Sequence, residues 1–233
     1  MRWQGKQVKV EVLFSVAGLA TQVLVEAGPV YLLFDAGDGT LRDLLARNIS
    51  PQKLTAIFIT HGHADHIAGL YGLLGYLRAE DHKGCVWICY PRGTCEVEEV
   101  IAAFKRCYNS TMPYELVSHP LDDGEIVRFG DLHVLAKKVL HWHSIKGRPI
   151  AAAPALGYRL TFQNETVAIT GDTAFFLGIE DLVKDADLAI IEATLTESAP
   201  LEQKHLIHLT KQKAQELARL AKNAFFYHLP PQV

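Results

Sequence analysis

The sequence predicts an α/β fold: a four-layer sandwich with two β-sheets inside and helices on both outer faces. Segments of strand length alternate with short helical segments, and this pattern begins again near Gly124. The chain has 233 residues, of which 49% are hydrophobic and 21% charged, and such a composition is typical of a globular fold that needs no disulfide bonds. We therefore expect one domain over residues 1–233, made of two similar halves at about 1–120 and 121–233.

The first half is predicted to begin as an antiparallel meander. Alternating apolar residues indicate a strand over 8–12, and a Gly-Pro turn separates two further strands over 22–26 and 30–34. A short helix is expected over 41–48. Strand and helix patterns then alternate, with strands at 55–59 and 85–89 and helices at 67–74 and 96–104.

The second half repeats the strand pattern and ends in a helix. Strands are expected near 125–129, 132–140, 156–162, 166–170 and 188–191. Thr210 is the expected N-cap of the last helix, whose apolar residues recur at helical spacing until Asn223. That apolar stripe is interpreted as core packing.

Composition excludes several classes of protein. The formal charge of −3 gives no overall attraction to nucleic acid, and the longest uncharged apolar stretch near the N-terminus, 12–25, is shorter than the roughly 18 residues that span a bilayer. The N-terminal segment does not read as a secretory signal, so we expect a cytoplasmic protein that does not enter a membrane. The four cysteines form no Cys-x-x-Cys pair and are expected to be reduced, mostly buried thiols.

The segment His61-Gly62-His63-Ala64-Asp65-His66 follows the predicted buried strand 55–59. In an extended turn the side chains of His61 and His63 point the same way, whereas Asp65 and His66 begin the next helix. Borderline-soft metal ions bind imidazole and carboxylate, and four donors in one turn suit a centre of two metal ions. The alternative, a polar loop with incidental histidines, explains this density poorly.

The motif His-x-His-x-Asp-His after an apolar strand resembles the signature of the metallo-β-lactamase superfamily, and the surrounding sequence resembles its ribonuclease Z branch. This second resemblance rests on the segments 33–40, 57–61, 69–74, 157–159, 171–173 and 187–194 and on the last helix. It implies the metallo-β-lactamase fold and a metal-dependent hydrolase.

The resemblance also implies three further metal ligands: a later histidine, a bridging aspartate and a final histidine. His141, which follows a predicted strand, is the first candidate, and His143, two residues later on the same face, remains the alternative. Asp172 lies in a glycine-led turn and is expected to bridge the metals, because a carboxylate offers two oxygens. The expected ligands are His61, His63, Asp65, His66, His141, Asp172 and His228.

Two divalent metal ions are therefore expected. Zinc is the first choice, and manganese or iron would accept the same donors. A zinc ion lowers the pKa of bound water to about 7, and two metals stabilise the attacking hydroxide and the developing charge. Asp65 would orient and deprotonate that water, and Asp35 is expected to orient ligand histidines through hydrogen bonds, with a role in the turn as the alternative.

A leaving group that is hard to expel needs an acid, and the expected pair is Glu192 with His208. Ribonuclease Z motifs read His-Glu-Ala-Thr and His-Ser-Thr, whereas residues 191–194 read Ile-Glu-Ala-Thr and 208–210 read His-Leu-Thr. His205 is the alternative to His208.

The expected substrate is a small phosphodiester or nucleotide. The segment 132–164 has five Lys or Arg and no Asp or Glu, and it could guide phosphate groups or simply be a solvated face. Ribonuclease Z proteins often insert an RNA-binding arm between the third histidine and the bridging aspartate, but that interval is only 31 residues here. We therefore predict a phosphodiesterase, with two alternatives: a carbonyl-ester hydrolase (a lactonase or glyoxalase-II-like thioesterase) or a tRNA 3′-end endonuclease acting on RNA.

Two further possibilities concern assembly and catalysis. Family members often dimerise, so a homodimer is also considered. A metal-binding regulator without catalysis would require a broken ligand set.

Overall fold

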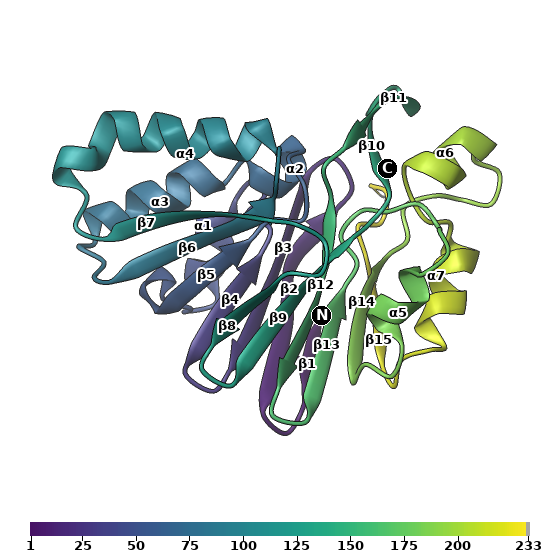
Figure 1. Cartoon of the computed structure of the whole chain (residues 1–233), viewed down its shortest axis with the longest axis horizontal. Coiled ribbons are helices and arrows are strands. Elements are labelled where there is room, and N and C mark those ends of the chain that lie inside the picture. The colour runs from purple at the N-terminus through teal and green to yellow at the C-terminus, as the bar shows by residue number, and fades with distance from the viewer. Residues whose placement is uncertain (232–233) are drawn as a thin grey trace.

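The computed structural model describes residues 1–231 and confirms the predicted four-layer α/β sandwich (Figure 1). The last two residues of the expected 1–233 domain lie outside the described residues. Two sheets pack face to face, and helices cover the outer face of each. The described part of the chain contains no helix that is both long and apolar enough to span a bilayer.

The first sheet has seven strands in sequence order. They are β1 (Arg2–Gln4), β2 (Val8–Val16), β3 (Ala20–Ala27), β4 (Val30–Phe34), β5 (Leu54–Phe58), β6 (Cys85–Pro91) and β7 (Glu115–Leu121). Strands β1 to β4 pair antiparallel, which confirms the predicted meander, and β4 to β7 pair parallel. The carboxyl ends of β4 and β5 therefore lie at the same edge of the sheet.

Helices cover the outer face of this sheet. They are α1 (Thr40–Ala46), α2 (Ala64–Ile67), α3 (Leu70–Ala79) and α4 (Cys95–Tyr108), with single 3₁₀ turns at η1 (Pro51–Lys53) and η2 (Asn109–Thr111). The prediction of a single helix over 67–74 is wrong, because the helix is interrupted between α2 and α3. Gly69 donates a backbone hydrogen bond to Ala36 O, and a Cβ at Gly69 would meet Gly37 O at 2.2 Å.

The second sheet repeats this plan with six strands, in the order β15-β14-β13-β12-β9-β8. The strands are β8 (Ile126–Phe129), β9 (Leu132–Lys138), β12 (Leu156–Phe162), β13 (Glu165–Ile169), β14 (Leu188–Glu192) and β15 (Ala224–Tyr227). Strands β8, β9, β12 and β13 pair antiparallel, whereas β13, β14 and β15 pair parallel. The helices of this half are α5 (Ile179–Val183), α6 (Leu201–Leu206) and α7 (Lys211–Ala218).

A separate hairpin, β10 (His141–Ile145) and β11 (Arg148–Ala153), projects from the body of the molecule (Figure 1). The sequence predicted one strand over 132–140, but β9 ends at Lys138 and the chain enters this hairpin at His141. The predicted N-cap of the last helix is confirmed, since the Thr210 hydroxyl accepts a hydrogen bond from Lys213 N.

Three apolar clusters hold the layers together. The central one lies between the sheets and includes the buried rings of Phe34, Phe58 and Tyr158, whose centroids are 5.2–5.6 Å apart. The other two lie between each sheet and its helices. Of the four free cysteines only Cys89 is buried, so the expectation of mostly buried thiols is wrong: the others lie at the start of β6 and on the solvent side of α4.

Candidate metal centre

The residues predicted as metal ligands converge where the carboxyl ends of the parallel strands of both sheets meet. His61 follows β5, Asp172 follows β13, and His228 follows β15. The two sheets are joined at this point, because His61 forms a β-bridge with Ala155. Loops at the carboxyl ends of parallel strands are a frequent place for binding sites in α/β folds.

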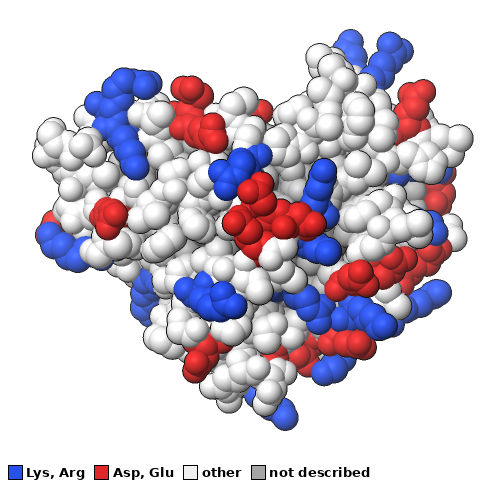
Figure 2. Space-filling model, in the orientation of Figure 1, with Lys and Arg blue, Asp and Glu red and all other residues white. Residues whose placement is uncertain are grey.

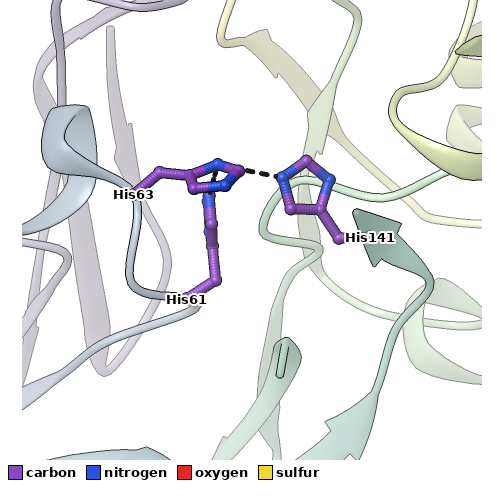
Figure 3. Close-up of side chains that lie close together, drawn as sticks. All are labelled: His61, His63 and His141. Carbon is purple, nitrogen blue, oxygen red and sulfur yellow. Dashed lines mark hydrogen bonds between the residues drawn. The ribbon is translucent and has the colours of Figure 1, made fainter. Parts of the chain in front are cut away.

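Three imidazoles form the first group. The Nε2 atom of His61 lies 3.0 Å from Nδ1 of His63, and Nε2 of His141 lies 3.2 Å from the same atom (Figure 3). His61 and His141 are buried, whereas His63 is partly exposed. Three nitrogens from two distant segments of the chain therefore face one point.

Asp65, His66 and His228 form the second group. Nε2 of His228 lies 3.2 Å from Oδ2 of Asp65 and 3.4 Å from Nε2 of His66. Asp172 lies between the two groups, with its Oδ2 atom 3.8 Å from His61, 3.4 Å from His66 and 3.3 Å from His228. The structure thus brings all seven predicted ligands together.

These distances fit metal coordination. Tetrahedral zinc with bonds of about 2.0–2.1 Å would hold neighbouring donor atoms about 3.3–3.4 Å apart, close to the 3.0–3.8 Å observed. The Oδ1 atom of Asp172 is buried and has no hydrogen-bond partner among residues 1–231. A buried carboxylate oxygen without a partner is costly, and a nearby cation would compensate it.

For four of the ligands, the electrostatics favour the protonation states that bind metal. Burial lowers the pKa of His141 to about 3 and holds the pKa values of His61 and His63 below the usual range. Burial also acts to raise the pKa of Asp65, but the hydrogen bond from His228 and the charge of His66 outweigh it and lower this pKa to about 2. Neutral imidazoles and ionised carboxylates are the metal-binding forms of these side chains.

Asp172 and His66 are buried and lie next to each other at the centre of the cluster. Burial acts against both charges, yet the surrounding histidines hold the pKa of Asp172 well below its usual range. Burial likewise opposes protonation of His66, but the charges of Asp172 and Asp35 hold its pKa well above the usual range. A cation bound at His66 would have to displace this proton.

Local backbone geometry fixes these side chains. A Cβ at Gly62 would meet Glu96 Oε2 at 2.5 Å and Thr94 Cγ2 at 2.7 Å, so a larger residue in the turn between His61 and His63 would displace these two side chains. Asp35 adopts a left-handed backbone conformation, with φ of 60°, directly after β4. Its carboxylate lies 2.8 Å from Nδ1 of His66 and accepts a hydrogen bond from the backbone N–H of Thr60.

Glu192 and His208 lie beside the cluster. His208 Nδ1 is 2.9 Å from Glu192 Oε1 and 3.9 Å from Asp172 Oδ2. Burial acts to lower the pKa of His208, but the charge and hydrogen bond of Glu192 outweigh it and raise the pKa to about 9. The residues that depart from the ribonuclease Z motifs, Ile191 and Leu209, are both buried in the outer apolar cluster of the second half and do not separate this pair.

The two residues that the sequence left as alternatives, His143 and His205, lie outside the donor groups described above. His143 contacts the opposite side of the His63 ring, with Nδ1 3.0 Å from His63 Nε2, and does not join the group formed with His141. His205 is exposed on α6, away from Glu192. Arg159, counted among the basic residues of 132–164, donates to Leu182 O and so anchors α5.

Sequence reasoning missed four supporting contacts. The Thr194 hydroxyl lies 2.9 Å from Nδ1 of His228 and donates to Glu192 Oε2. The backbone N–H group of Gly18 donates to Asp65 Oδ2. The backbone N–H group of His228 donates to Ser15 Oγ. Thr194 belongs to a motif that the sequence did show, whereas the loop from Ser15 to Gly18 carried no signal.

Comparisons with known proteins agree with this geometry. A profile of the Beta-lactamase superfamily domain matches residues 30–228. A protein named Ribonuclease Z from Geobacillus kaustophilus is 27% identical over 247 residues, covering 89% of this chain and 79% of that protein.

Three solved structures share the fold. The metallo-β-lactamase fold protein YhfI from Bacillus subtilis has a TM-score of 0.76 at 21% identity, and the match covers 98% of this chain and 88% of the YhfI chain. The short form of human tRNase Z has a TM-score of 0.76 at 24% identity, with 95% and 92% covered. A diphosphatase of the PhnP family has a TM-score of 0.71 at 21% identity, with 96% and 87% covered.

The metallo-β-lactamase fold implies divalent metal ions, and the donor cluster described above lies within the matched residues. The chain therefore belongs to the β-lactamase superfamily and is a metal-dependent hydrolase of the metallo-β-lactamase fold with a ribonuclease Z-like sequence.

Proposed function

We propose that this protein is a phosphodiesterase that hydrolyses a nucleotide or another small phosphodiester with the help of two divalent metal ions. The observation that carries this proposal is the Glu192–His208 pair beside the metal centre. The proposed ligands are His61, His63 and His141 for one ion and Asp65, His66 and His228 for the other, with Asp172 between them. Imidazole and carboxylate donors favour zinc and also accept manganese or iron.

The Glu192–His208 pair suits a leaving group that must be protonated. The charge and hydrogen bond of Glu192 raise the pKa of His208 to about 9, and this favours the imidazolium with a proton on both ring nitrogens. Nδ1–H of His208 donates a hydrogen bond to Glu192, so the Nε2–H group is free to donate to the oxygen of a departing alcohol. A thiolate leaves readily without such help, and this difference favours phosphodiesters over thioesters.

Other residues of the chain would bind and orient the substrate. The ionised Asp65 can accept a hydrogen bond from a water molecule that attacks phosphorus. When bound, two divalent ions would neutralise phosphate charge and lower the pKa of that water.

The surroundings of the centre suit a small substrate. A hollow of about 470 Å³ beside His63 is lined mainly by apolar side chains of α2, α3 and α4 and has the volume of a small-molecule site. Lysine and arginine gather at the tip of the short hairpin β10–β11, but positive and negative residues alternate over the rest of the face in Figure 2. We therefore favour a nucleotide-sized substrate over a folded RNA.

The relatives named Ribonuclease Z support a second candidate, cleavage of RNA at the 3′ end of tRNA precursors. Their similarity extends over most of both chains. The short hairpin His141–Ala153 argues against this second candidate. It occupies the interval between the third histidine and the bridging aspartate, where a longer RNA-binding arm would be inserted. The four free thiols fit a reducing compartment, and we propose the cytoplasm as the place of the reaction.

The first test is turnover of bis(p-nitrophenyl) phosphate, a lactone, a thioester and a tRNA precursor by metal-loaded protein. We expect cleavage of the phosphodiester, and its loss in Asp65→Ala. Preference for the lactone or thioester would overturn the proposal in favour of carbonyl hydrolysis, and preference for the tRNA precursor would favour the second candidate. Inactivity on all four substrates with two metals bound would contradict a phosphodiesterase.

The second test compares leaving groups. His208→Ala should lower kcat by about 10²–10⁴-fold on an alkyl phosphodiester, whose alkoxide needs a proton, and much less on a p-nitrophenyl ester. Equal losses on both substrates would contradict an acid role for His208. His205→Ala, which removes an exposed imidazole from α6, is the matched control.

A further inference from the structure

Four of the five imidazoles in the cluster are held in the same way. Each turns Nε2 toward the cluster and uses Nδ1 for a hydrogen bond to a neighbouring oxygen. These contacts are His61 with Thr60 Oγ1 (3.1 Å), His66 with Asp35 Oδ2 (2.8 Å), His141 with Ile207 O (2.7 Å) and His228 with Thr194 Oγ1 (2.9 Å). Such contacts fix the tautomer and the ring orientation of metal-binding histidines.

His63 is reversed. Its Nδ1 atom faces His61 and His141, which leaves Nε2 on the outer side of the ring (Figure 3). That Nε2 atom lies 3.0 Å from Nδ1 of His143. Within residues 1–231, His143 is the one hydrogen-bond partner of this nitrogen outside the cluster.

We propose that His143 is a positioning residue for the metal centre, which accepts a hydrogen bond from Nε2–H of His63 and holds Nδ1 of His63 free to bind metal. This inference rests on the proposed function insofar as His63 is a ligand. It assigns His143 a role distinct from that of a ligand and from that of His141.

The proton positions follow from the geometry. A nitrogen that binds metal must present a lone pair, so Nδ1 of His63 carries no proton and Nε2 does. His143 must then accept at Nδ1 and carry its own proton on Nε2. Without His143, the other tautomer of His63 becomes available, and it would direct an N–H group toward the place where the cation binds.

The hairpin explains how His143 reaches this position. His141 and His143 lie two residues apart on β10, so both side chains are on the same face. The pairing register of β10 and β11 shifts directly after His143, between His143 and Ser144. Such a shift bends the strand, and here the bend falls immediately beyond the residue that contacts His63.

The test uses a matched pair of variants. In His143→Asn the side-chain oxygen replaces Nδ1 as acceptor, whereas His143→Leu has a similar size and no acceptor. Chelator competition on the zinc-loaded protein should show that Leu weakens binding of one of the two ions by about 10–100-fold and that Asn restores most of it. His205→Ala is the control that removes an imidazole elsewhere.

Two results would overturn the proposal. Equal zinc affinity in wild type, Asn and Leu would mean that the contact does not position His63. If the Asn and Leu variants both bind one zinc ion fewer per chain than wild type, His143 is itself a ligand.

A metal-free measurement separates this inference from the proposed function. Nitrogen-15 NMR of the histidine rings should show a larger share of the Nε2–H tautomer of His63 in wild type and in His143→Asn than in His143→Leu. If wild type binds no zinc but shows this tautomer pattern, the proposed function fails, whereas the control of the His63 tautomer by His143 stands. If the tautomer of His63 is the same in all three proteins, the inference fails whether or not zinc binds.

Discussion

At the scale of single residues, Glu192 is notable because it is fully buried and yet surrounded by donors. Its two oxygens accept hydrogen bonds from the backbone N–H groups of Thr173, Thr194 and Leu209 and from the Thr194 hydroxyl. These donors fix the position of the carboxylate. In the proposed mechanism Glu192 acts through His208, which it orients and whose pKa it raises.

Replacing Glu192 by Gln should move the alkaline limb of the pH–rate profile. An acid works only when protonated, so activity on an alkyl phosphodiester should fall as pH rises through the pKa of His208. That pKa is about 9 without metal, and bound cations lower it. Loss of the Glu192 charge should shift that limb down by about one to two pH units. An unchanged limb in kcat against pH would contradict the pairing, and Glu202→Gln on α6 is the control.

At the scale of elements, Glu165 connects the two sheets. It opens β13 in the second sheet, and its carboxylate accepts hydrogen bonds from the backbone N–H groups of Lys6 and Gln7, which precede β2, and of Val8, which begins it. Burial acts to raise its pKa, but these three backbone donors outweigh it and hold the pKa below the usual range. The contact joins segments more than 150 residues apart in the chain.

Replacing Glu165 by Gln should destabilise the protein in a pH-dependent way. At pH 7 we expect a loss of about 1–3 kcal/mol in the free energy of unfolding, because backbone donors lose a charged acceptor. Since the folded pKa lies below the unfolded value, this contribution is present above pH 4.5 and disappears as pH falls through the folded pKa. Urea unfolding of both proteins between pH 7 and pH 3 measures it. If the difference in unfolding free energy between the two proteins does not shrink at low pH, the ionised carboxylate of Glu165 is not its cause. Glu99→Gln on α4 is the control.

At the scale of the whole molecule, the metal centre joins both halves of the sandwich. His61, His63 and His66 belong to the first half, whereas His141, Asp172 and His228 belong to the second. The donor atoms are therefore in place only when both sheets are folded against each other. Ligands that bind only the folded state stabilise it by mass action.

Removing metal should therefore lower the stability of the whole protein. A metal present at 100 times its dissociation constant contributes about 2.7 kcal/mol, which corresponds to about 5–10 °C in Tm for a chain of this size. We expect a chelator to lower Tm by that amount and added zinc to restore it in thermal unfolding experiments. His141→Ala should show a smaller response, and a wild-type Tm that is insensitive to chelator would contradict metal binding by the folded state.

Much of the fold could be predicted because its elements are encoded locally. Alternation in β2, the apolar runs of β4 and β5 and the Thr210 cap each depend on neighbours within a few residues. The predictions failed where distant contacts intervene. The break between α2 and α3 is one example, because it depends on the approach of Gly69 to the loop after β4.

The sequence by itself determined the sandwich class, the meander and the dense group of donors from His61 to His66, since the periods of strands and helices and the spacing of a motif are local properties. Only the tertiary structure decided that His141 lies with that group, that His143 stands behind His63, and that His208 lies beside Glu192. Residues two or three apart in sequence look equivalent in a linear pattern. Which of them reaches a site depends on strand register and on the packing of one sheet against the other, and long-range burial and hydrogen bonding fix both.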